Sequence, residues 1–592
     1  MDGINMKQLM ILALFSFAFN QPVLNCCDYQ EMAENECNGL GCYIPQCTEE
    51  CEWEPMQCWG STGYCWCVDG NGIEIEGTST PSWEGFPDCE EIYLGTTFNI
   101  PSDYPSIQEG IDVASDGDTI LVHPGTYYGP IDFERKNLVI GSLFLLDADT
   151  SFISQTIIMG TDSNVSPFVQ IDGISEPEVE LNGFTFQDIS LNTFAEGTQS
   201  YVLINIINAS PKIINNRFNN FQIDGQAESA VIFCSNSSSL IENNIFSDGM
   251  IALNYELTGW ILSNNSNLII KNNLMENGYV GFSDPTGYVV SVASDNIITE
   301  NTFNNVSMGY CWTCAAIVAL DGSSLIINNN MILRATGDGY GAILASESQY
   351  VSHNNTLIAN NGGYANLFSD GIVNNDIIIN YPNGWGNPVY LDAYSTLQIS
   401  YSNIEGGVSG SGMVGNINSN PMFVDANNGD YSLSNYSPAI GAGTATGAPS
   451  TDIIGATRPT PSGSNPDMGA YENSRPSQRP KAGAITDGLS TDVDWHNSSS
   501  SLSAKWPNFV DNGNIATLVT EFAIGSTTSN LADVLTWTTV SVDTGAGPSY
   551  TATGLSLTEG STYYVSVRAT HTDSQVSDTT TSDGVTSDVT NP

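Results

Sequence analysis

The feature that most constrains the fold is a repeat in the middle of the chain. Its unit is apolar–x–Asn–Asn–x–apolar, with clear copies at 213–218, 241–246 and 270–275. The second Asn recurs at Asn216, Asn244, Asn273, Asn301, Asn330, Asn355 and Asn375, at intervals of 28, 29, 28, 29, 25 and 20 residues. A repeat of this length that holds two or three short strands is one coil of a right-handed parallel β-helix. The sequence therefore predicts a mainly β protein.

Apolar columns on both sides of the repeated Asn indicate which residues point inward. Three places before it stand Ile213, Ile241, Ile270, Ile298, Ile327, Ser352 and Ile372. Two places after it stand Phe218, Phe246, Met275, Phe303, Ile332, Leu357 and Ile377. Because coils lie about 4.8 Å apart, like residues stack on like residues. We expect the Asn residues to form a structural ladder of hydrogen bonds between rungs.

The N-terminus has the pattern of a secretory signal. Lys7 precedes an apolar stretch from Leu9 to Phe19 that is too short to span a bilayer. We expect residues 1–25 to be a signal peptide and the protein to be secreted, extracellular or on the cell surface. No later segment is long and apolar enough to cross a membrane. The net charge of -52 argues against nucleic acid and anionic lipid as partners.

Ten of the 13 cysteines lie between Cys26 and Cys89, which indicates an oxidising compartment and a disulfide-rich module at 26–90. The residues that identify it are Cys47, Cys58, the run Cys65-Trp66-Cys67-Val68, Gly77-Thr78 and Cys89. This pattern resembles the thyroglobulin type-1 domain. Some members of that family inhibit papain-like cysteine proteases, and others are spacers or binding modules.

The resemblance also implies disulfide pairings. It implies the bonds Cys58–Cys65 and Cys67–Cys89. It implies a third bond from Cys47 to an upstream cysteine, for which we expect Cys27 and keep Cys26 as the alternative. The module has four cysteines more than the family's six, including Cys37, Cys42 and Cys51, which suggest two further bonds.

The β-helix is expected to occupy residues 95–472. Before the repeat, Ile107, Ile111 and Ala114 share one face of an amphipathic helix, followed by a segment at 116–127. This region resembles the N-terminal cap and first coil of pectin-lyase-like secreted proteins. Such a helix would cover strand edges at the open end of the stack. His123 is expected to be structural.

Candidate catalytic residues are scattered over the predicted rungs. Glu242 and Lys271 fall one rung apart, which a surface ion pair explains, and Arg334 and Asp338 lie in a Gly-rich loop. A hydrolase needs two carboxylates within about 5–10 Å, and no compact acid–base set is evident. We therefore expect a protein that is not an enzyme. If it is one, a polysaccharide lyase or glycoside hydrolase acting on the β-helix face is the alternative.

The remaining site candidates concern calcium and three cysteines. Asp425, Asn427 and Asp430 have a spacing typical of a calcium loop but lack the glutamate that completes an EF-hand, and an Asn-Gly turn explains them equally. Ca²⁺ is thus the one cofactor that the sequence suggests. Cys311–Cys314 is expected to be a local disulfide. Cys234 lies beyond the roughly 7 Å Cα limit for bonding either and is expected to be a free, buried thiol.

The C-terminal part is expected to be a separate module. Residues 473–481 read as a linker, and 482–592 resemble a fibronectin type III domain, with Trp506 in the core and Tyr563 as the tyrosine-corner residue. Together, the modules predict a secreted or cell-surface protein with a rigid rod for adhesion or for binding polysaccharide or cell-surface glycan. Inhibition of a cysteine protease by the N-terminal module is the second alternative.

Overall fold

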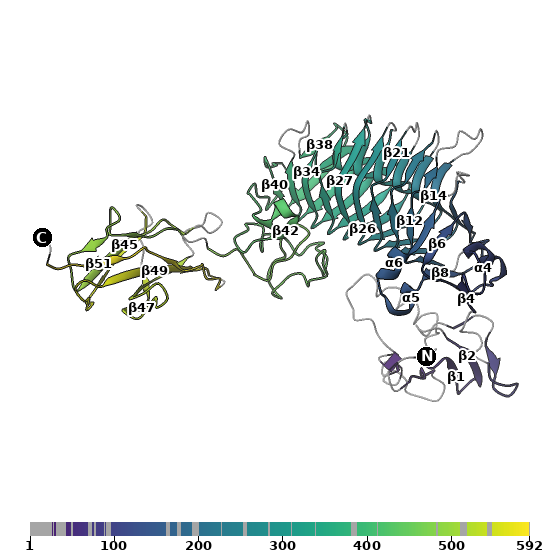
Figure 1. Cartoon of the computed structure of the whole chain (residues 1–592), viewed down its shortest axis with the longest axis horizontal. Coiled ribbons are helices and arrows are strands. Elements are labelled where there is room, and N and C mark those ends of the chain that lie inside the picture. Colours follow the sequence, from purple (N-terminus) through teal and green to yellow (C-terminus); the bar gives the residue numbers. More distant parts are fainter. Residues whose placement is uncertain are drawn as a thin grey trace, which may run out of the picture.

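The computed structural model describes most of the chain beyond residue 95 and parts of the N-terminal module (Figure 1). The described residues are 26, 27, 29, 30, 33, 43–48, 51, 53–68, 74–75, 78–87, 89, 96–160, 166–173, 179–191, 200–225, 228–252, 257–281, 284–309, 311–337, 339–380, 388–410, 413–480, 483–509, 518–540, 547–572 and 574–590. The predicted signal peptide, Cys37, Cys42 and Asp338 lie outside them.

Three parallel sheets form the solenoid, and each coil adds strands to them in turn. The first sheet contains β4 (Thr97–Ile100), β5 (Thr119–Val122), β8 (Val139–Ser142), β11 (Glu180–Asn182), β15 (Lys212–Ile214), β19 (Leu240–Glu242), β23 (Ile269–Lys271), β26 (Asp295–Thr299), β29 (Ser324–Asn328), β33 (Gln349–His353), β36 (Asp370–Asn374) and β39 (Thr396–Ser400). The third sheet contains β7 (Ile131–Asp132), β10 (Val169–Asp172), β14 (Ser200–Ile207), β18 (Glu228–Ser235), β22 (Thr258–Asn264), β25 (Thr286–Val292), β28 (Cys314–Leu320), β32 (Gly341–Ser346), β35 (Tyr364–Leu367) and β38 (Val389–Leu391).

The second sheet has a main path and a side branch where the chain bends. Its path contains β6 (Gly125–Tyr128), β9 (Thr156–Met159), β12 (Thr185–Gln187), β16 (Arg217–Asn219), β20 (Ile245–Ser247), β24 (Leu274–Gly281), β27 (Thr302–Gly309), β30 (Met331–Leu333), β34 (Thr356–Asn360), β37 (Ile377–Asn380) and β40 (Asn403–Ile404). The branch contains β13 (Ser190–Leu191), β17 (Gln222–Asp224), β21 (Met250–Ala252) and β31 (Thr336–Gly337). The predicted mainly β solenoid is confirmed.

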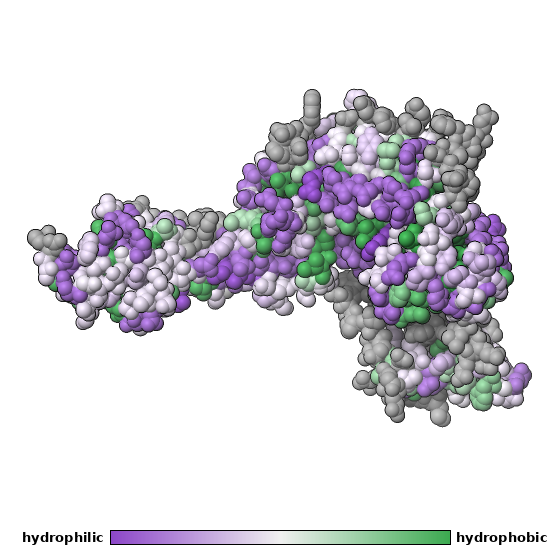
Figure 2. All heavy atoms as spheres, viewed as in Figure 1, coloured by the Kyte–Doolittle hydropathy of each residue, from purple (hydrophilic) through white to green (hydrophobic). Residues whose placement is uncertain are grey.

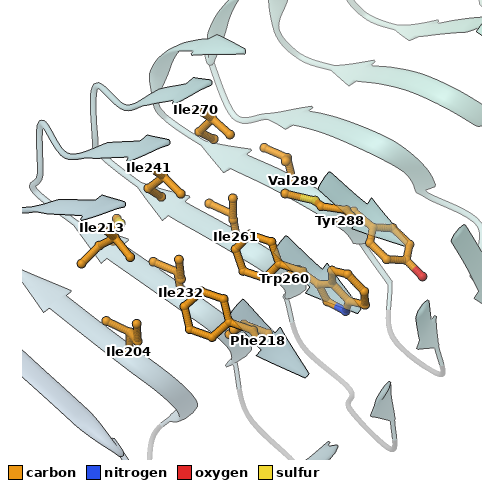
Figure 3. Packing of buried hydrophobic residues seen from close by; sticks show 14 of the residues in the cluster. Ile204, Ile213, Phe218, Ile232, Ile241, Trp260, Ile261, Ile270, Tyr288 and Val289 are labelled. Carbon is orange, nitrogen blue, oxygen red and sulfur yellow. The ribbon is translucent and has the colours of Figure 1, made fainter. Parts of the chain in front are cut away.

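The inward columns pack as the repeat predicts. Ile213 pairs with Ile241, which pairs with Ile270, and all three are fully buried. Figure 3 shows this column beside that of the third sheet. The rings of Phe218 and Phe246 stack with centroids 4.7 Å apart. Burying such a side chain stabilises by roughly 1.5–3 kcal/mol, so the repeat itself supplies a continuous core.

The repeated Asn residues form the expected ladder. The backbone N–H of Asn244 donates to Oδ1 of Asn273 at 2.9 Å, and that of Asn273 donates to Oδ1 of Asn301 at 2.9 Å. Nδ2 of Asn273 donates to the carbonyl of Ile241 at 2.8 Å. Because these groups are buried, each side chain satisfies backbone atoms that the turn would otherwise leave without partners.

One rung departs from the predicted alignment. Ser352 pairs with Val373 rather than Ile372, and the ladder position after Asn355 is held by Asp376 rather than Asn375. The inward residue that follows is Ile378 rather than Ile377. The shift by one residue escaped the sequence because a carboxylate replaces the amide there, while an Asn-Asn pair stands one place earlier.

Both ends of the solenoid are covered. Helix α4 (Ile107–Val113) buries Ile107 and Ile111 against the first coil, as expected, and two short helices, α5 (Phe144–Asp147) and α6 (Ser151–Gln155), follow. At the other end, β41 (Phe423–Asp425), the 3₁₀ turn η2 (Ala426–Asn428) and β42 (Asp430–Leu433) lead into loops. Buried Arg458 donates to the carbonyls of Asp467, Gly469 and Ala470 within these loops and lies 3.5 Å from Glu472. It ties the loops to the stack by donating to Oδ1 of Asn329 at 3.4 Å.

The N-terminal module is cross-linked by disulfides and contains an antiparallel sheet of β1 (Met56–Trp59), β2 (Tyr64–Cys67) and β3 (Thr80–Pro81). It contains the bonds Cys58–Cys65 and Cys67–Cys89. The expected bond Cys27–Cys47 is wrong, since Cys47 bonds to Cys26 and Cys27 bonds to Cys51. Cys26 is the fully buried member of the adjacent pair, and its N–H donates to the carbonyl of Cys51. Spacing cannot choose between neighbouring cysteines.

The C-terminal module is a β-sandwich. One sheet contains β43 (Thr486–Asp487), β45 (Ser501–Lys505) and β48 (Ser549–Thr553), and the other contains β44 (Trp495–His496), β46 (Val519–Gly525), β47 (Leu535–Val540), β49 (Thr562–Thr570), β50 (Thr580–Thr581) and β51 (Val585–Ser587). Trp506 is buried, and the Tyr563 hydroxyl accepts from the N–H of Thr558 at 2.7 Å. Among the described residues, no helix is long and apolar enough to cross a membrane.

Asp376 gives the solenoid a pH-dependent stability. It is fully buried, accepts from Ser352 and Tyr364, and burial raises its pKa to about 6. A carboxyl whose pKa is higher in the folded state binds its proton more tightly there, so the free energy of unfolding falls as pH rises from about 4 to about 6. Asp376→Asn should abolish this fall in the free energy of unfolding, which amounts to about 3 kcal/mol. The variant should therefore be more stable than the wild type at pH 7. Denaturant unfolding of the wild type and the variant at about pH 4 and at pH 7 checks this. The same pH dependence of the free energy of unfolding in both proteins would contradict it.

Cys234 should be inert in the native protein. It is the free cysteine of the described residues, it is fully buried, and burial raises its pKa to about 12. Because the thiolate is the reactive form, a thiol reagent should label it only after unfolding. Mass spectrometry of labelled native and denatured protein measures this, with Cys234→Ser as the blank. Rapid labelling of the folded chain would show that the rung opens locally.

Candidate functional site

The predicted ion pair is part of a larger charged cluster. Nζ of Lys271 lies 3.5 Å from Glu242 and 3.8 Å from Glu300, a carboxylate on the following rung. Burial raises the pKa of Glu300; Lys271 opposes this effect, and Glu242 and Asp452 add to it. The lysine thus neutralises two half-buried carboxylates that would otherwise repel each other.

Sequence reasoning missed Glu300. Its position belongs to a column of left-handed turn residues, in which Asn243 and Asn272 have φ of 58° and 50° and Glu300 has φ of 60°. Asn tolerates this conformation better than most residues. A Glu in an otherwise Asn column was therefore a signal in the sequence, since it occupies a backbone position that does not favour it.

Arg334 does not meet the other catalytic candidates. Its guanidinium donates to Oδ1 of Asn304 and to the hydroxyl of Tyr431 at 3.5 Å. Asp338, the other candidate in that loop, lies outside the described residues. Arg334 thus links a rung to the C-terminal loops.

The predicted calcium loop has its oxygens engaged locally. Asp425 accepts from Nδ2 of Asn428 at 2.6 Å, and Asp430 accepts from the N–H and hydroxyl of Ser432. These bonds from Ser432 lower the pKa of Asp430. Asn427 lies in η2 between them. Calcium binding by Asp425, Asn427 and Asp430 stays a prediction. The predicted disulfide Cys311–Cys314 is present.

A shallow groove lies where the second sheet bends, and we call it the bend groove. Its volume is about 480 Å³, and it is lined by Asp248, Gly249, Met250, Asn277, Gly278, Tyr279, Asn305 and Ser307. These residues come from β21, β24 and β27 and the turns beside them. Figure 2 shows a hydrophilic stripe crossing the solenoid at the level of β27.

The floor of the bend groove repeats from rung to rung. Asp248, Asn277 and Asn305 occupy equivalent left-handed positions on three successive rungs and are exposed. Nδ2 of Asn305 donates to Oδ1 of Asn277 at 2.9 Å. The side chains therefore form a row of hydrogen-bonding groups with one negative charge. Such a row can bind hydroxyl groups, but it contains no second carboxylate to complete an acid–base pair.

Tyr279 supplies the aromatic wall of the bend groove. Gly281 and Gly309 leave room for its side chain, because a Cβ at either position would lie 2.3 Å from the Tyr279 hydroxyl oxygen. Its ring lies beside Met250 and Ser307, with which it pairs across β21, β24 and β27. An aromatic ring next to a row of amides is the arrangement that combines stacking with hydrogen bonding.

A second groove of about 310 Å³ lies at the turn between the first and second sheets. Phe144, Thr150 and Ile153 of the α5–α6 region line one side, and the rest is lined by Asn215, Asn216, Arg217, Asn243, Ile245 and Asn272. Asn272 adjoins Lys271 in sequence, so the charged cluster lies at one end of this groove. It is the described site where catalysis on the β-helix face would be sought.

The N-terminal module presents exposed aromatic side chains at one end of its sheet. Trp83 and Phe86 are 67% and 65% exposed, and Tyr64 packs edge-on against Trp83 with centroids 5.8 Å apart. Gly63 has φ of 73°, and a Cβ there would lie 2.9 Å from the Trp83 ring. Large exposed aromatic side chains are typical of binding surfaces.

Comparison with solved structures yields only distant likeness. Pectate lyase Pel9A matches with 13% identity and a TM-score of 0.30, over 64% of this chain and 96% of that one. The receptor-binding tailspike of bacteriophage Det7 matches with 11% identity and a TM-score of 0.19, over 84% and 99%. At these values the comparison adds nothing to what the order of the parallel sheets already shows.

Sequence comparison identifies the N-terminal module. It is 54% identical over 61 residues to Equistatin of Actinia equina, 44% over 69 residues to Nidogen-2 of Mus musculus and 48% over 52 residues to Testican-2 of Homo sapiens. The matches cover 10%, 11% and 9% of this chain and 25%, 5% and 12% of those proteins, so the chain spans a quarter or less of each relative. The family described as Thyroglobulin type-1 repeat matches residues 28–89. Residues 28–89 of this chain are therefore a thyroglobulin type-1 repeat.

Proposed function

We propose that the protein is secreted and binds a neutral polysaccharide in the bend groove without cleaving it. The observation that carries this proposal is the row of Asp248, Asn277 and Asn305 beside the ring of Tyr279. The signal-like N-terminus and the disulfides support secretion. The remaining modules, including the fibronectin type III-like sandwich at 482–592, then act as spacers or as further binding modules.

The geometry of the row suits a glycan chain. Successive rungs lie about 4.8 Å apart, close to the length of one sugar unit in an extended polysaccharide. Each unit can therefore meet one rung and find an amide or carboxylate for its hydroxyl groups. The Tyr279 ring offers an apolar face against which a sugar ring can pack.

Charge selects the class of polysaccharide. The chain carries 65 acidic and 13 basic residues, and the bend groove itself contains Asp248 and no basic side chain. A polymer of uronic or sulfated sugars would be repelled by this surface. Polymers of neutral hexoses are not repelled, so we expect the ligand to be a neutral polysaccharide.

The charged cluster does not favour catalysis. Lys271 contacts both Glu242 and Glu300, so its charge is shared between two carboxylates. A hydrolase needs one carboxylic acid to donate a proton while a second carboxylate acts as base or nucleophile. Lys271 opposes the rise in the pKa of Glu300 that burial causes, and its two ion pairs hold both carboxylates against one cation rather than leaving them free to act on a substrate.

Binding of full-length protein to a panel of neutral hexose polymers and to polygalacturonate, measured by calorimetry, tests the proposal. We expect a neutral polymer to bind, and Tyr279→Ala to weaken the affinity at least tenfold, about 1.4 kcal/mol. Tyr279→Phe keeps the ring and should retain most of the affinity. Tyr128→Ala, at an exposed tyrosine remote from the groove, should leave it unchanged.

Two results would contradict the proposal. Equal affinity in the wild type and Tyr279→Ala would remove the bend groove as the binding site. Release of new reducing ends or unsaturated sugars, abolished by Glu300→Gln, would instead show a polysaccharide-cleaving enzyme that works through the charged cluster.

A second candidate function rests on the N-terminal module. We infer that the thyroglobulin type-1 repeat inhibits a papain-like cysteine protease through the exposed loop around Trp83. The rigid pair of Tyr64 and Trp83 and the exposed Phe86 support this role, because they offer a narrow apolar edge suited to a protease cleft.

Titration of papain with the full-length protein tests this second function. We expect inhibition, and Trp83→Ala should weaken it at least about tenfold because the apolar edge is lost. Trp312→Ala removes a tryptophan that is 86% exposed on the solenoid and serves as the matched control. Absence of inhibition at micromolar protein would exclude the function for this class of protease.

A further inference from the structure

The C-terminal sandwich brings three carboxylates together from distant parts of its sequence. Asp487 ends β43, Asp492 lies in the turn that follows, and Asp583 lies between β50 and β51. Each offers one oxygen, and the three oxygens all lie within 4.8 Å of one another. Within the described part of the chain, this is the one group of three acidic, His or Cys side chains that comes so close.

Asp487 differs from its two partners in being completely buried. Its Oδ2 accepts from the N–H of Gly584 at 3.2 Å, but its Oδ1 has no hydrogen-bond partner in the structure and no contact with solvent. A buried carboxylate oxygen without a partner costs several kcal/mol. Burial raises the pKa of this carboxyl to about 6; hydrogen bonds from the Ser582 side chain and the Gly584 N–H oppose the rise, and the charges of Asp492 and Asp583 add to it. The site therefore concentrates negative charge around an oxygen that lacks any positive counterpart.

The surrounding backbone holds the carboxylates in place. Oδ1 of Asp492 accepts from the N–H of Asp487 at 2.7 Å, and the N–H of Val493 donates to the carbonyl of Asp487 at 3.0 Å. Asp492 and Asp583 are both exposed. An ion can therefore approach from the solvent side, and Asp487 lies at the buried end of the group.

We propose that Asp487, Asp492 and Asp583 bind one Ca²⁺ ion. Calcium takes six to eight oxygen ligands, mostly carboxylates, carbonyls and waters, in flexible geometry. Oδ1 of Asp487 is the inner ligand, the two exposed carboxylates close over the ion, and waters complete its shell on the open side. Mg²⁺ demands stricter octahedral geometry and dehydrates reluctantly, so the larger ion suits this site better.

The ion would join the two ends of the sandwich. Asp487 and Asp492 belong to the first strand and its turn, whereas Asp583 belongs to the connection between the last two strands. Binding to the folded state alone stabilises that state, so calcium should hold the first strand against the last. The site is separate from the loop at Asp425 and from the bend groove, and its function does not depend on polysaccharide binding.

Calcium titration of the chelator-treated full-length protein, by calorimetry at physiological ionic strength, tests the proposal together with thermal unfolding. We expect calcium to raise the unfolding midpoint of the sandwich. Asp487→Asn keeps an acceptor for the Gly584 N–H and removes the buried charge, so it should fold, be at least as stable without calcium, and lose both one bound ion and the midpoint shift. Asp494→Asn, an exposed carboxylate of the same segment outside the group, should behave as the wild type.

The outcomes are distinct for each possibility. If Asp487→Asn does not fold, Asp583→Asn at an exposed position carries the same test. Calcium stoichiometry and midpoint shift identical to those of the wild type in these variants would overturn the proposal, as would a wild-type sandwich whose midpoint does not move with millimolar calcium. Loss of the response in Asp425→Asn alone would assign the ion to the other loop.

Discussion

The structure depends on the hydrogen bond that each buried Asn makes to the backbone of the next rung. The turn between the first and second sheets buries an N–H that a strand ladder cannot satisfy, and Oδ1 of the neighbouring Asn accepts it, as Asn273 does for Asn244. The Asn side chain also donates to a carbonyl behind it. By accepting from one backbone group and donating to another, each Asn fixes the conformation of the turn. That conformation determines which residues of the next strand face the core. The outward rows, including the floor of the bend groove, inherit the same spacing.

The ladder explains how much of the fold the sequence predicted. The Asn column, the stacked isoleucines, the cap helix and the free Cys234 all follow from one period and from the rise of a parallel sheet. The prediction failed where the residue type changed without a change of role. Asp376 takes an Asn position, so pattern matching selected Asn375 instead. The choice between Cys26 and Cys27 failed because the spacings of two adjacent cysteines to any partner differ by only one residue.

The functional sites were less predictable because they depend on contacts between columns. Glu300 meets Lys271 through the stacking of rungs, and its place in an Asn column was the one sequence signal for it. Asp487 and Asp583 meet only when the sandwich closes. The bend groove arises from the bend of a sheet, which periodicity does not report. What the sequence did predict was a shortage of basic residues, and the described grooves accordingly contain rows of amides rather than paired catalytic groups.

Buried ionisable groups gather near the C-terminal end of the solenoid, and this has a mechanical consequence. Asp376 lies two rungs beyond Asn330, and Arg458 and Glu472 lie in the loops that cover the same end. In a solenoid, each rung is held mainly by its neighbours, so a load applied through the sandwich acts first on the last rung, formed by β38, β39 and β40, and next on the rung of the buried carboxylate Asp376. Under tension, unravelling should begin there and proceed inward rung by rung. The rungs around Tyr279, nearer the middle of the rod, would remain folded longest and could hold a ligand while the end yields.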